Sequence, residues 1–477
     1  MSTATAPLTD PSPPLVRALE RMRAAFLKDM MPSLTTRRDR LARLAQMTKR
    51  HAPDIMDTIN ADFGHRSRHE TLIADLLAVD EAVRYAQRNL REWMRPRRVP
   101  TDIKYRPGFN RLISQPLGVV GVVAPWNYPY QLSMLPALGA LAAGNRVMIK
   151  PSELAPRTAA LMTRIVRESF ADDELIVFPG DAAVGKAFTE LPFDHLFFTG
   201  STAVGRVVAQ AAAKNLTPVT LELGGKSPVI VDVKGSFESI APKIAVGKLF
   251  NAGQTCIAPD YALVPRERVD EFAIAMWHAM GVLYPTLADN PDYSSIINER
   301  HFGRLTDLLA DAKARGARFV DVNPAGEMFD ATQRKLAPAI VLDVNDGMRI
   351  MREEIFGPLL PVVPYDKLDD ALAYINARDR PLALYLFSDT RRGRERALAN
   401  TIAGGVTVNG CLTHFAQEAQ PFGGVGASGT GSYHGVHGFR TFSKQKAVYY
   451  EPRFGILPLL MPPYGKVLDK VYQWFQR

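Results

Sequence analysis

The chain has 477 residues, of which 47% are hydrophobic, and it carries a formal net charge of +9. Its length exceeds the ~250–300 residues at which one hydrophobic core stops growing, so two or more domains are expected. Its two cysteines, Cys256 and Cys411, exclude a disulfide framework, and its longest apolar runs fall far short of the ~18 residues that cross a bilayer.

The sequence does not open on a charged and then apolar leader, which favours a reducing, cytoplasmic location. Residues 1–14 contain four prolines without hydrophobic periodicity and predict a disordered lead-in. From Leu15 to about Trp93 the apolar spacing is helical. The proline-flanked, basic segment from Pro96 to Pro116 then predicts a projecting β-hairpin arm, which typically meets another subunit.

The densest positive charge of the chain surrounds this arm. Its members are Arg91, Arg95, Arg97, Arg98, Lys104, Arg106 and Arg111. Such a basic cluster is one feature of nucleic-acid-binding proteins, so that function has to be considered. However, the 49 acidic residues are dispersed and no nucleic-acid-binding motif is present, so a solvated or subunit-facing surface is favoured. A mildly basic protein also suits anionic ligands, which include dinucleotides and carboxylic acids.

After the arm, apolar β-prone segments alternate with helical ones. The pairs are Gly118–Ala124 with Pro129–Ala143, Arg146–Lys150 with Pro156–Phe170, Glu174–Phe178 with Ala182–Glu190, and Asp194–Phe198 with Thr202–Lys214. Such alternation predicts a parallel, doubly wound sheet covered on both faces, an architecture that commonly binds dinucleotides. A second alternation starts at Pro228–Val233 and continues to about residue 409, which predicts a second domain.

Two glycine-rich stretches compete as the phosphate-facing turn. Gly424 to Gly429 matches the GxGxxG pattern, but no strand-then-helix context surrounds it, and an irregular loop is favoured there. Phe197 to Gly205 is the better candidate, because an apolar strand ends in a glycine turn that opens a helix. Neither this stretch nor Gly225-Lys226-Ser227 makes a phosphate loop of the ATPase kind.

Cys256 and Glu222 lie at the entrance to the second domain and are interpreted as nucleophile and base. A free thiol has a pKa of ~8.5, so a carboxylate that takes its proton, or that activates water, would support such chemistry. Taken alone, a lone cysteine is more often a small buried apolar residue and a glutamate is usually on the surface. The histidine pairs His65/His69 and His434/His437 have no evident third ligand, so no metal site is expected.

Seven motifs in order make the chain resemble the aldehyde dehydrogenase superfamily from about residue 15 to 450. They are Ala124-Pro125-Trp126-Asn127-Tyr128-Pro129, Ala143-Gly144-Asn145 through Lys150-Pro151-Ser152-Glu153, Phe198-Thr199-Gly200-Ser201-Thr202, Glu222-Leu223-Gly224-Gly225-Lys226, Gly253-Gln254-Thr255-Cys256, Glu353-Glu354-Ile355-Phe356-Gly357-Pro358 and Pro421-Phe422-Gly423-Gly424. Gly431-Ser432-Tyr433-His434-Gly435, followed by Gly438-Phe439 and Phe442-Ser443, resembles the class 3 branch, which oxidises aromatic and long-chain aldehydes. Within that branch the chain most resembles the coniferyl aldehyde dehydrogenases.

The resemblance implies an α/β fold with two doubly wound parallel-sheet domains, a Rossmann-like cofactor domain and a catalytic domain, plus a β-hairpin oligomerisation arm. The implied division is a lead-in at 1–14, an NAD-binding domain of 15–97 and 117–222, an arm of 98–116 with about 426–450, a catalytic domain of 223–425 and a C-terminal tail of 451–477. A homodimer or a dimer of dimers is implied as well. The apolar tail is expected to cover a subunit surface or the substrate entrance rather than to insert into a membrane.

The resemblance also assigns roles to single residues. It makes Cys256 the nucleophile, Glu222 the base that activates water, and the Asn127 amide one donor to the oxyanion. The positions that match cofactor contacts are Trp126, Lys150, Ser152, Glu153, Gly200, Ser201, Val204, Gly224, Glu354 and Phe356. NAD is the expected cofactor and NADP a possible one, because the Glu153 carboxylate suits ribose hydroxyls and repels a 2′-phosphate.

Several alternatives stay open at this point. The substrate could be a medium- or long-chain aliphatic aldehyde instead of an aromatic one. A cysteine hydrolase and a catalytically silent structural protein are rivals from other classes, but no histidine motif accompanies Cys256, and Asn127, Glu222 and Glu354 occur together. Acyl-transferring relatives typically lack the glutamate that Glu222 supplies, so hydrolysis to the free acid is favoured.

Overall fold

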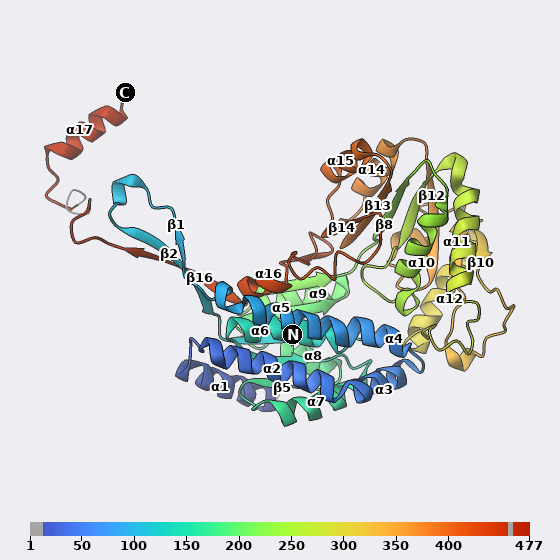
Figure 1. The fold of residues 1–477 in the computed structure, drawn as a ribbon, viewed down its shortest axis with the longest axis horizontal. Coiled ribbons are helices and arrows are strands. Elements are labelled where there is room, and N and C mark those ends of the chain that lie inside the picture. The colour runs from blue at the N-terminus through green and yellow to red at the C-terminus, as the bar shows by residue number, and fades with distance from the viewer. Residues whose placement is uncertain (1–12, 457–460) are drawn as a thin grey trace, which may run out of the picture.

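The computed structural model describes residues 13–456 and 461–477 of the chain. Two α/β bodies pack together, and a three-stranded arm projects from the first of them (Figure 1). The predicted lead-in of residues 1–14 falls almost entirely outside the described residues, as does the apolar part of the tail at residues 457–460.

The first body is built on a six-stranded sheet with the strand order β15-β7-β6-β3-β4-β5. The strand bounds are β3 (Val119–Val123), β4 (Arg146–Lys150), β5 (Leu175–Val177), β6 (His195–Gly200), β7 (Val219–Leu223) and β15 (Gly429–Thr430). All neighbours are parallel except the edge strand β15, which runs antiparallel to β7. The predicted alternation of strands and helices from Gly118 to Lys214 is confirmed, since each predicted strand and helix is present within a few residues of its expected bounds.

Helices cover this sheet, and the continuous apolar character of its strands follows from that cover. The bounds are α1 (Pro13–Lys28), α2 (Leu34–Arg50), α3 (Ala52–Phe63), α4 (Arg68–Thr71), α5 (Ala78–Trp93), α6 (Gln131–Ala143), α7 (Pro156–Ser169), α8 (Ala182–Thr189) and α9 (Thr202–Ala213). All 13 residues of α6 are buried. This helix contacts β3 and β4 as well as α2 and α5, which places the predicted N-terminal helices as an outer layer.

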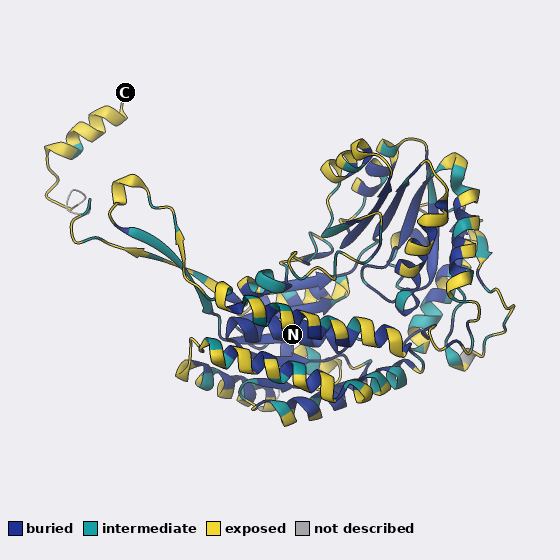
Figure 2. Cartoon of the chain, viewed as in Figure 1, coloured by how far each residue is buried: buried dark blue, intermediate teal, exposed yellow. Residues whose placement is uncertain are grey.

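The second body contains a seven-stranded sheet with the order β10-β11-β12-β9-β8-β13-β14, parallel except for the edge strand β10. The strand bounds are β8 (Pro228–Asp232), β9 (Tyr261–Pro265), β10 (Arg318–Asp321), β11 (Ala339–Leu342), β12 (Leu359–Tyr365), β13 (Ala383–Ser388) and β14 (Gly405–Val408). The helix bounds are α10 (Ala241–Leu249), α11 (Val269–Leu283), α12 (Glu299–Ala314), α13 (Arg349–Arg352), α14 (Leu368–Asn376) and α15 (Arg391–Asn400). The central strands are buried and the helices expose their outer faces (Figure 2).

The arm consists of β1 (Arg97–Val99), β2 (Phe109–Pro116) and β16 (Ser443–Tyr450), all antiparallel. Only β16 of the expected second arm segment, about 426–450, belongs to this sheet. The strand β15 instead pairs with β7, and α16 (Gly435–Thr441) packs against α5 and α6. The reason is that Phe439 is buried, which ties α16 to the first body.

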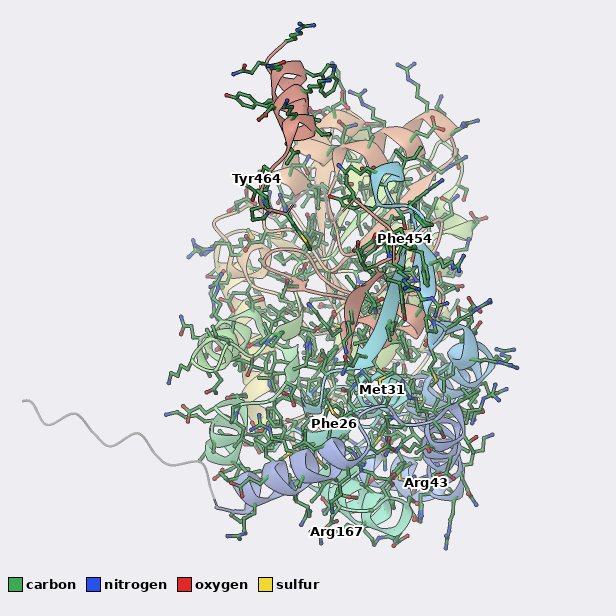
Figure 3. All side chains as sticks on the ribbon, turned by 90° about the vertical axis from the view of Figure 1, so that its left-hand side faces the viewer. Phe26, Met31, Arg43, Arg167, Phe454 and Tyr464 are labelled. Atoms are coloured by element: carbon green, nitrogen blue, oxygen red, sulfur yellow. The ribbon has the colours of Figure 1, made fainter. Side chains whose placement is uncertain are left out.

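The tail continues from the arm to α17 (Lys466–Phe475), which has no buried residue. Figure 1 shows α17 beyond the arm and away from both bodies, and in Figure 3, where Phe454 and Tyr464 are labelled, the same helix lies at the top of the view. Trp474 and Phe475 are 75% and 80% exposed. In the described part of the chain, no helix is both long and apolar enough to span a membrane.

A tight turn after α10 carries the chain to Cys256. Asn251, Ala252 and Gly253 have φ angles of 54°, 50° and 76°, so three consecutive residues adopt the left-handed conformation. A Cβ atom on Gly253 would overlap the carbonyl oxygen of Gly357, which is rigid backbone. Glycine at position 253 is therefore required both by the backbone angle and by the space available.

Gly253→Ala is expected to destabilise the protein by at least ~1–3 kcal/mol and to reduce activity, because it adds left-handed strain and a backbone clash beside Cys256. Gly303→Ala is the matched control. Gly303 lies in α12 and has no atom within 4 Å of the place that a Cβ atom would take, so alanine there is expected to be neutral or stabilising. Urea midpoints of both variants test this expectation, and equal midpoints would contradict it.

Candidate active site

The carboxyl ends of the parallel strands of the first sheet meet at one edge. Val123 pairs with both Lys150 and Phe198, and Thr199 pairs with Glu222. This register brings motifs that are far apart in the sequence into one row. Ligands of open α/β sheets bind at this edge.

A cavity of about 240 Å³ opens at this edge and extends to the second body. Most of the predicted site residues line it together. They are Trp126, Asn127, Gly200, Ser201, Glu222, Gly224, Cys256, Glu354 and Phe356. The structure thus brings the predicted nucleophile, base and amide donor to a single enclosed space.

The remaining predicted cofactor residues lie outside this cavity. Lys150 is buried at the end of β4, where its Nζ donates to the Pro151 carbonyl at 2.7 Å and lies 3.8 Å from a Glu153 carboxylate oxygen. Glu153 is exposed, and the Val204 side chain is exposed on the first turn of α9. Ser152 accepts the Leu154 N–H, which shapes the turn after β4. Lys150 and Ser152 are thus buried at the end of β4 and in the turn after it, while Glu153 and Val204 are exposed.

Hydrogen bonds fix the loop that carries Cys256. The Gln254 side chain donates to the carbonyls of Asn251 and Ser295, each at 3.0 Å, and accepts the Ile297 N–H at 3.0 Å. The Asn127 Nδ2 donates to the Gln254 carbonyl at 3.2 Å. Asn127 is therefore held against the cysteine loop, with its amide group at the wall of the cavity.

A buried charged network supports the same loops from behind. Arg66 donates to the Asn127 carbonyl and pairs with Asp75 at 3.3 Å, both of them fully buried. Asp75 in turn accepts the N–H of Gln131 at the start of α6. Glu70 accepts the Asn251 N–H at 3.0 Å, which anchors the left-handed turn.

A half-buried lysine, Lys226, holds the loop that carries Glu354 and Phe356. Lys226 forms an ion pair with Asp260 and donates to the Glu353 carbonyl at 2.9 Å. Asp260 also accepts the Ile355 N–H at 2.9 Å. The Glu354 carboxylate then lies directly against Gly224, where a Cβ atom would occupy its position. Burial raises the pKa of Glu354 to about 8, and the Asp260 carboxylate adds to this effect.

Cys256 and Glu222 both lie where their charged forms are disfavoured. Burial raises the pKa of the Cys256 thiol to about 12, and the Glu354 and Glu222 carboxylates add to the effect. Burial alone raises the pKa of Glu222 well above its ordinary value. Within the described residues, neither oxygen of Glu222 has a hydrogen-bond partner. The resting site thus holds a thiol and an uncompensated carboxyl group that is a strong base once it is deprotonated.

A second cavity, of about 400 Å³, reaches Cys256 from the other side. Its walls are mainly apolar and come from the π-helical segment Leu72–Leu77, from α5 and α6, and from the loop after β14. Cys256 lines both cavities. A molecule in the second cavity and one in the first can therefore meet at the sulfur.

Other residues of the site were not identified from the sequence. His301, Arg304, Leu382 and Phe415 also line the first cavity. His301 and Arg304 lie in the first turns of α12, where the sequence has only an ordinary helical pattern. Phe422 and Tyr433 belong to the motifs that carry the family resemblance, but only the fold shows that they line the cavity. Among the described residues, no group of three or more His, Cys, Asp or Glu side chains is placed to hold a metal ion.

The chain is similar to known proteins over almost its whole length. The sequence profile of the aldehyde dehydrogenase family matches residues 11–448. A probable coniferyl aldehyde dehydrogenase from Pseudomonas aeruginosa is 49% identical over 458 residues, which are 96% of this chain and 95% of the relative. A coniferyl aldehyde dehydrogenase from Pseudomonas sp. strain HR199 is 45% identical over 454 residues, 94% of each chain.

Solved structures show the same fold. The substrate-bound state of Staphylococcus aureus AldH has a TM-score of 0.90 and 36% sequence identity, covering 97% of this chain and 99% of that one. An indole-3-acetaldehyde dehydrogenase from P. syringae, in complex with NAD+ and IAA, has a TM-score of 0.83 and 26% identity, covering 92% and 89%. The predicted family and fold class are confirmed.

The raised pKa of Cys256 predicts how the isolated protein reacts with iodoacetamide. Below its pKa the thiolate fraction grows about tenfold per pH unit, so we expect the alkylation rate to keep rising from pH 7 to 10. A thiol with the ordinary pKa of ~8.5 would level off above about pH 9. Peptide mapping distinguishes Cys256 from the buried Cys411, and a plateau below pH 9 at Cys256 would contradict the expectation.

Proposed function

Because the chain belongs to the aldehyde dehydrogenase family, we propose that it oxidises aromatic aldehydes of the cinnamaldehyde type to carboxylic acids with NAD(P) as cofactor. The observation that carries the proposal is the position of Cys256 on the shared wall of two cavities, one lined by Glu222 and Glu354 and the other mainly apolar. The substrate class rests on the relatives named as coniferyl aldehyde dehydrogenases.

The first chemical step is attack of the Cys256 sulfur on the aldehyde carbon. A C–S bond forms and the carbonyl oxygen becomes an oxyanion. Donors to this oxyanion are the Asn127 Nδ2 and the backbone N–H of Cys256, and one such donor lowers the barrier by ~2.7–4 kcal/mol. The thiol proton has to leave, and Glu222 is the base that lines the same cavity.

The second step converts this adduct to a thioester on Cys256. A nicotinamide dinucleotide, held at this edge by residues such as Gly224, Glu354 and Phe356, would supply the acceptor for the hydride that the carbon attached to sulfur has to lose. After Glu222 has passed the thiol proton to solvent, it takes a proton from water, the water oxygen attacks the thioester, and the C–S bond breaks to release the acid and the Cys256 thiolate. Since neither oxygen of Glu222 is bonded to another described group, both are available to a water molecule.

The residues at the edge of the first sheet fit a dinucleotide. The 240 Å³ cavity suits its nicotinamide end, where the Glu354 carboxylate against Gly224 can accept from ribose hydroxyls. Ser201 caps α9, whose first N–H groups suit the pyrophosphate. Lys150, Ser152, Glu153 and Val204 extend the site for the adenosine end. Because Glu153 is a carboxylate, we propose a preference for NAD, moderated by Lys150 at 3.8 Å.

We also propose a homodimer, or a dimer of dimers, in which the arm and the tail meet a second copy of the chain. The exposed side of α17 and the projecting arm are the surfaces that would be covered. Sedimentation equilibrium measures the mass, and a monomer would contradict this assembly.

Medium- or long-chain aliphatic aldehydes are the second candidate substrates, because the walls of the 400 Å³ cavity are largely apolar.

An aldehyde panel assayed by NADH absorbance tests the proposed function. The highest kcat/KM is expected for a cinnamaldehyde with NAD rather than NADP. Cys256→Ala is expected to abolish activity while Cys411→Ala keeps most of it, because Cys411 lines only the second, mainly apolar cavity and not the one that holds Glu222. Similar losses in both folded variants, or acetaldehyde as the best substrate, would contradict the proposal.

Glu222→Gln tests the order of the steps. If Glu222 activates the hydrolytic water, this variant forms the thioester but hydrolyses it very slowly. Mixing it with NAD and substrate is expected to release about one equivalent of NADH per active site and then nearly stop. Mass spectrometry would locate the acyl group on Cys256. Steady turnover near the wild-type rate would mean that another group activates the hydrolytic water.

A further inference from the structure

The second cavity contains an acidic region whose role the reaction steps leave unassigned. Most of its walls are apolar, and its only charged lining residues among those described are Glu81 and Glu418. Glu81 is exposed on α5, whereas Glu418 is half-buried in the loop between β14 and β15. Cys256 lines the same cavity, so a substrate whose aldehyde group meets the sulfur has the rest of its body in contact with these walls.

The backbone holds Glu418 in place. Its Oε2 accepts the Gly435 N–H at 3.2 Å. A Cβ atom on Gly435 would overlap the Glu418 carbonyl oxygen, and Gly435 has a φ angle of 43°, so the two segments approach as closely as they do because residue 435 is glycine. Within the described residues, the Oε1 of Glu418 accepts no hydrogen bond from a protein group. One oxygen of a fixed carboxyl group is thus free for a ligand.

The charges of the cavity restrict what that ligand can be. Without a lysine or arginine on the described walls, an aldehyde that carries a carboxylate would meet two acidic side chains and no cationic partner. A carboxylate accepts hydrogen bonds and does not donate them, so the matching group on the substrate is a donor. A neutral hydroxyl on an aromatic ring combines such a donor with an apolar body. An ammonium group would lose its hydration against the apolar walls.

We propose that Glu418 is a specificity-determining residue whose Oε1 accepts a hydrogen bond from a phenolic hydroxyl on the substrate ring. This assignment rests on the proposed function, and what it adds is the residue that recognises a hydroxyl group on the substrate ring. Burial at this place raises the pKa of Glu418 to about 7, and the Glu81 carboxylate adds to the effect, so the accepting, ionised form predominates above pH 7. Glu418 takes no part in bond making or breaking.

The test compares three aldehydes that differ at one position: 4-hydroxycinnamaldehyde, cinnamaldehyde and 4-methoxycinnamaldehyde. The wild-type enzyme is expected to prefer the hydroxylated substrate in kcat/KM by about 10- to 100-fold, as a hydrogen bond to a charged group would give. Glu418→Ala is expected to lose that preference while its kcat/KM for cinnamaldehyde stays within about threefold of wild type. Glu418→Gln keeps an acceptor and gains a donor. It is therefore expected to keep part of the preference for the hydroxyl group and to have a higher kcat/KM than wild type for 4-methoxycinnamaldehyde.

Controls separate this proposal from its rivals. Glu81→Gln removes the other charge of the cavity, and Gln131→Met removes a neutral amide from its wall; both are expected to keep the hydroxyl preference. Loss of the preference in either control but not in the Glu418 variants would overturn the assignment, as would a preference for 4-aminobutanal in the wild type. If the wild type oxidised cinnamaldehyde without any hydroxyl preference, the assignment would fail while the proposed function stood. If it oxidised none of these aldehydes, the proposed function itself would fail.

Discussion

The burial of Glu222 without a hydrogen-bond partner is the constraint on which the rest of the site depends. An ionised carboxylate in such a place is strongly disfavoured, and even a neutral one forgoes hydrogen bonds that water would supply. A chain tolerates this only where the surrounding structure leaves the side chain no alternative. Glu222 meets that condition because it lies on β7, whose backbone is paired on both sides, with β6 and with β15.

The Cys256 loop and the buried charges behind it are also held in place by the structure around them. The Cys256 loop passes through three left-handed residues and is stable because the Gln254 amide bonds to two segments, the Asn251 turn and residues 295–297. Behind it, Arg66 and Asp75 form a fully buried pair that also binds the Asn127 carbonyl and the start of α6. Breaking such a pair leaves an uncompensated charge, so these residues position the site without lining its first cavity.

The sequence allowed the prediction of those features that local patterns encode. Apolar strands covered on both faces, such as Val119–Val123, and the motifs at their carboxyl ends predict one edge where the chemistry gathers, because parallel strands share that edge. The positioning roles of Arg66, Glu70 and Asp75 cannot be predicted from local patterns. Each residue lies in or beside a helical segment and acquires its role through contacts with residues far along the chain. The same holds for His301 and Arg304. The residues of α16 were assigned to the arm because the burial of Phe439 against the first body is not visible in a glycine-rich stretch.

The electrostatics of the two cavities give the resting enzyme a further property. Cys256 lies where the pKa of its thiol is about 12, so at neutral pH very little thiolate is present, and the thiolate is the form that oxidants and alkylating agents attack. An exposed cysteine with a depressed pKa would be ready to react with an aldehyde but equally ready to be oxidised. Here the same burial that raises the pKa of Cys256 raises that of Glu222, which makes Glu222 a base strong enough to take the thiol proton once it is itself deprotonated. Reactivity therefore depends on a proton leaving the shared site rather than on a thiolate that persists between turnovers.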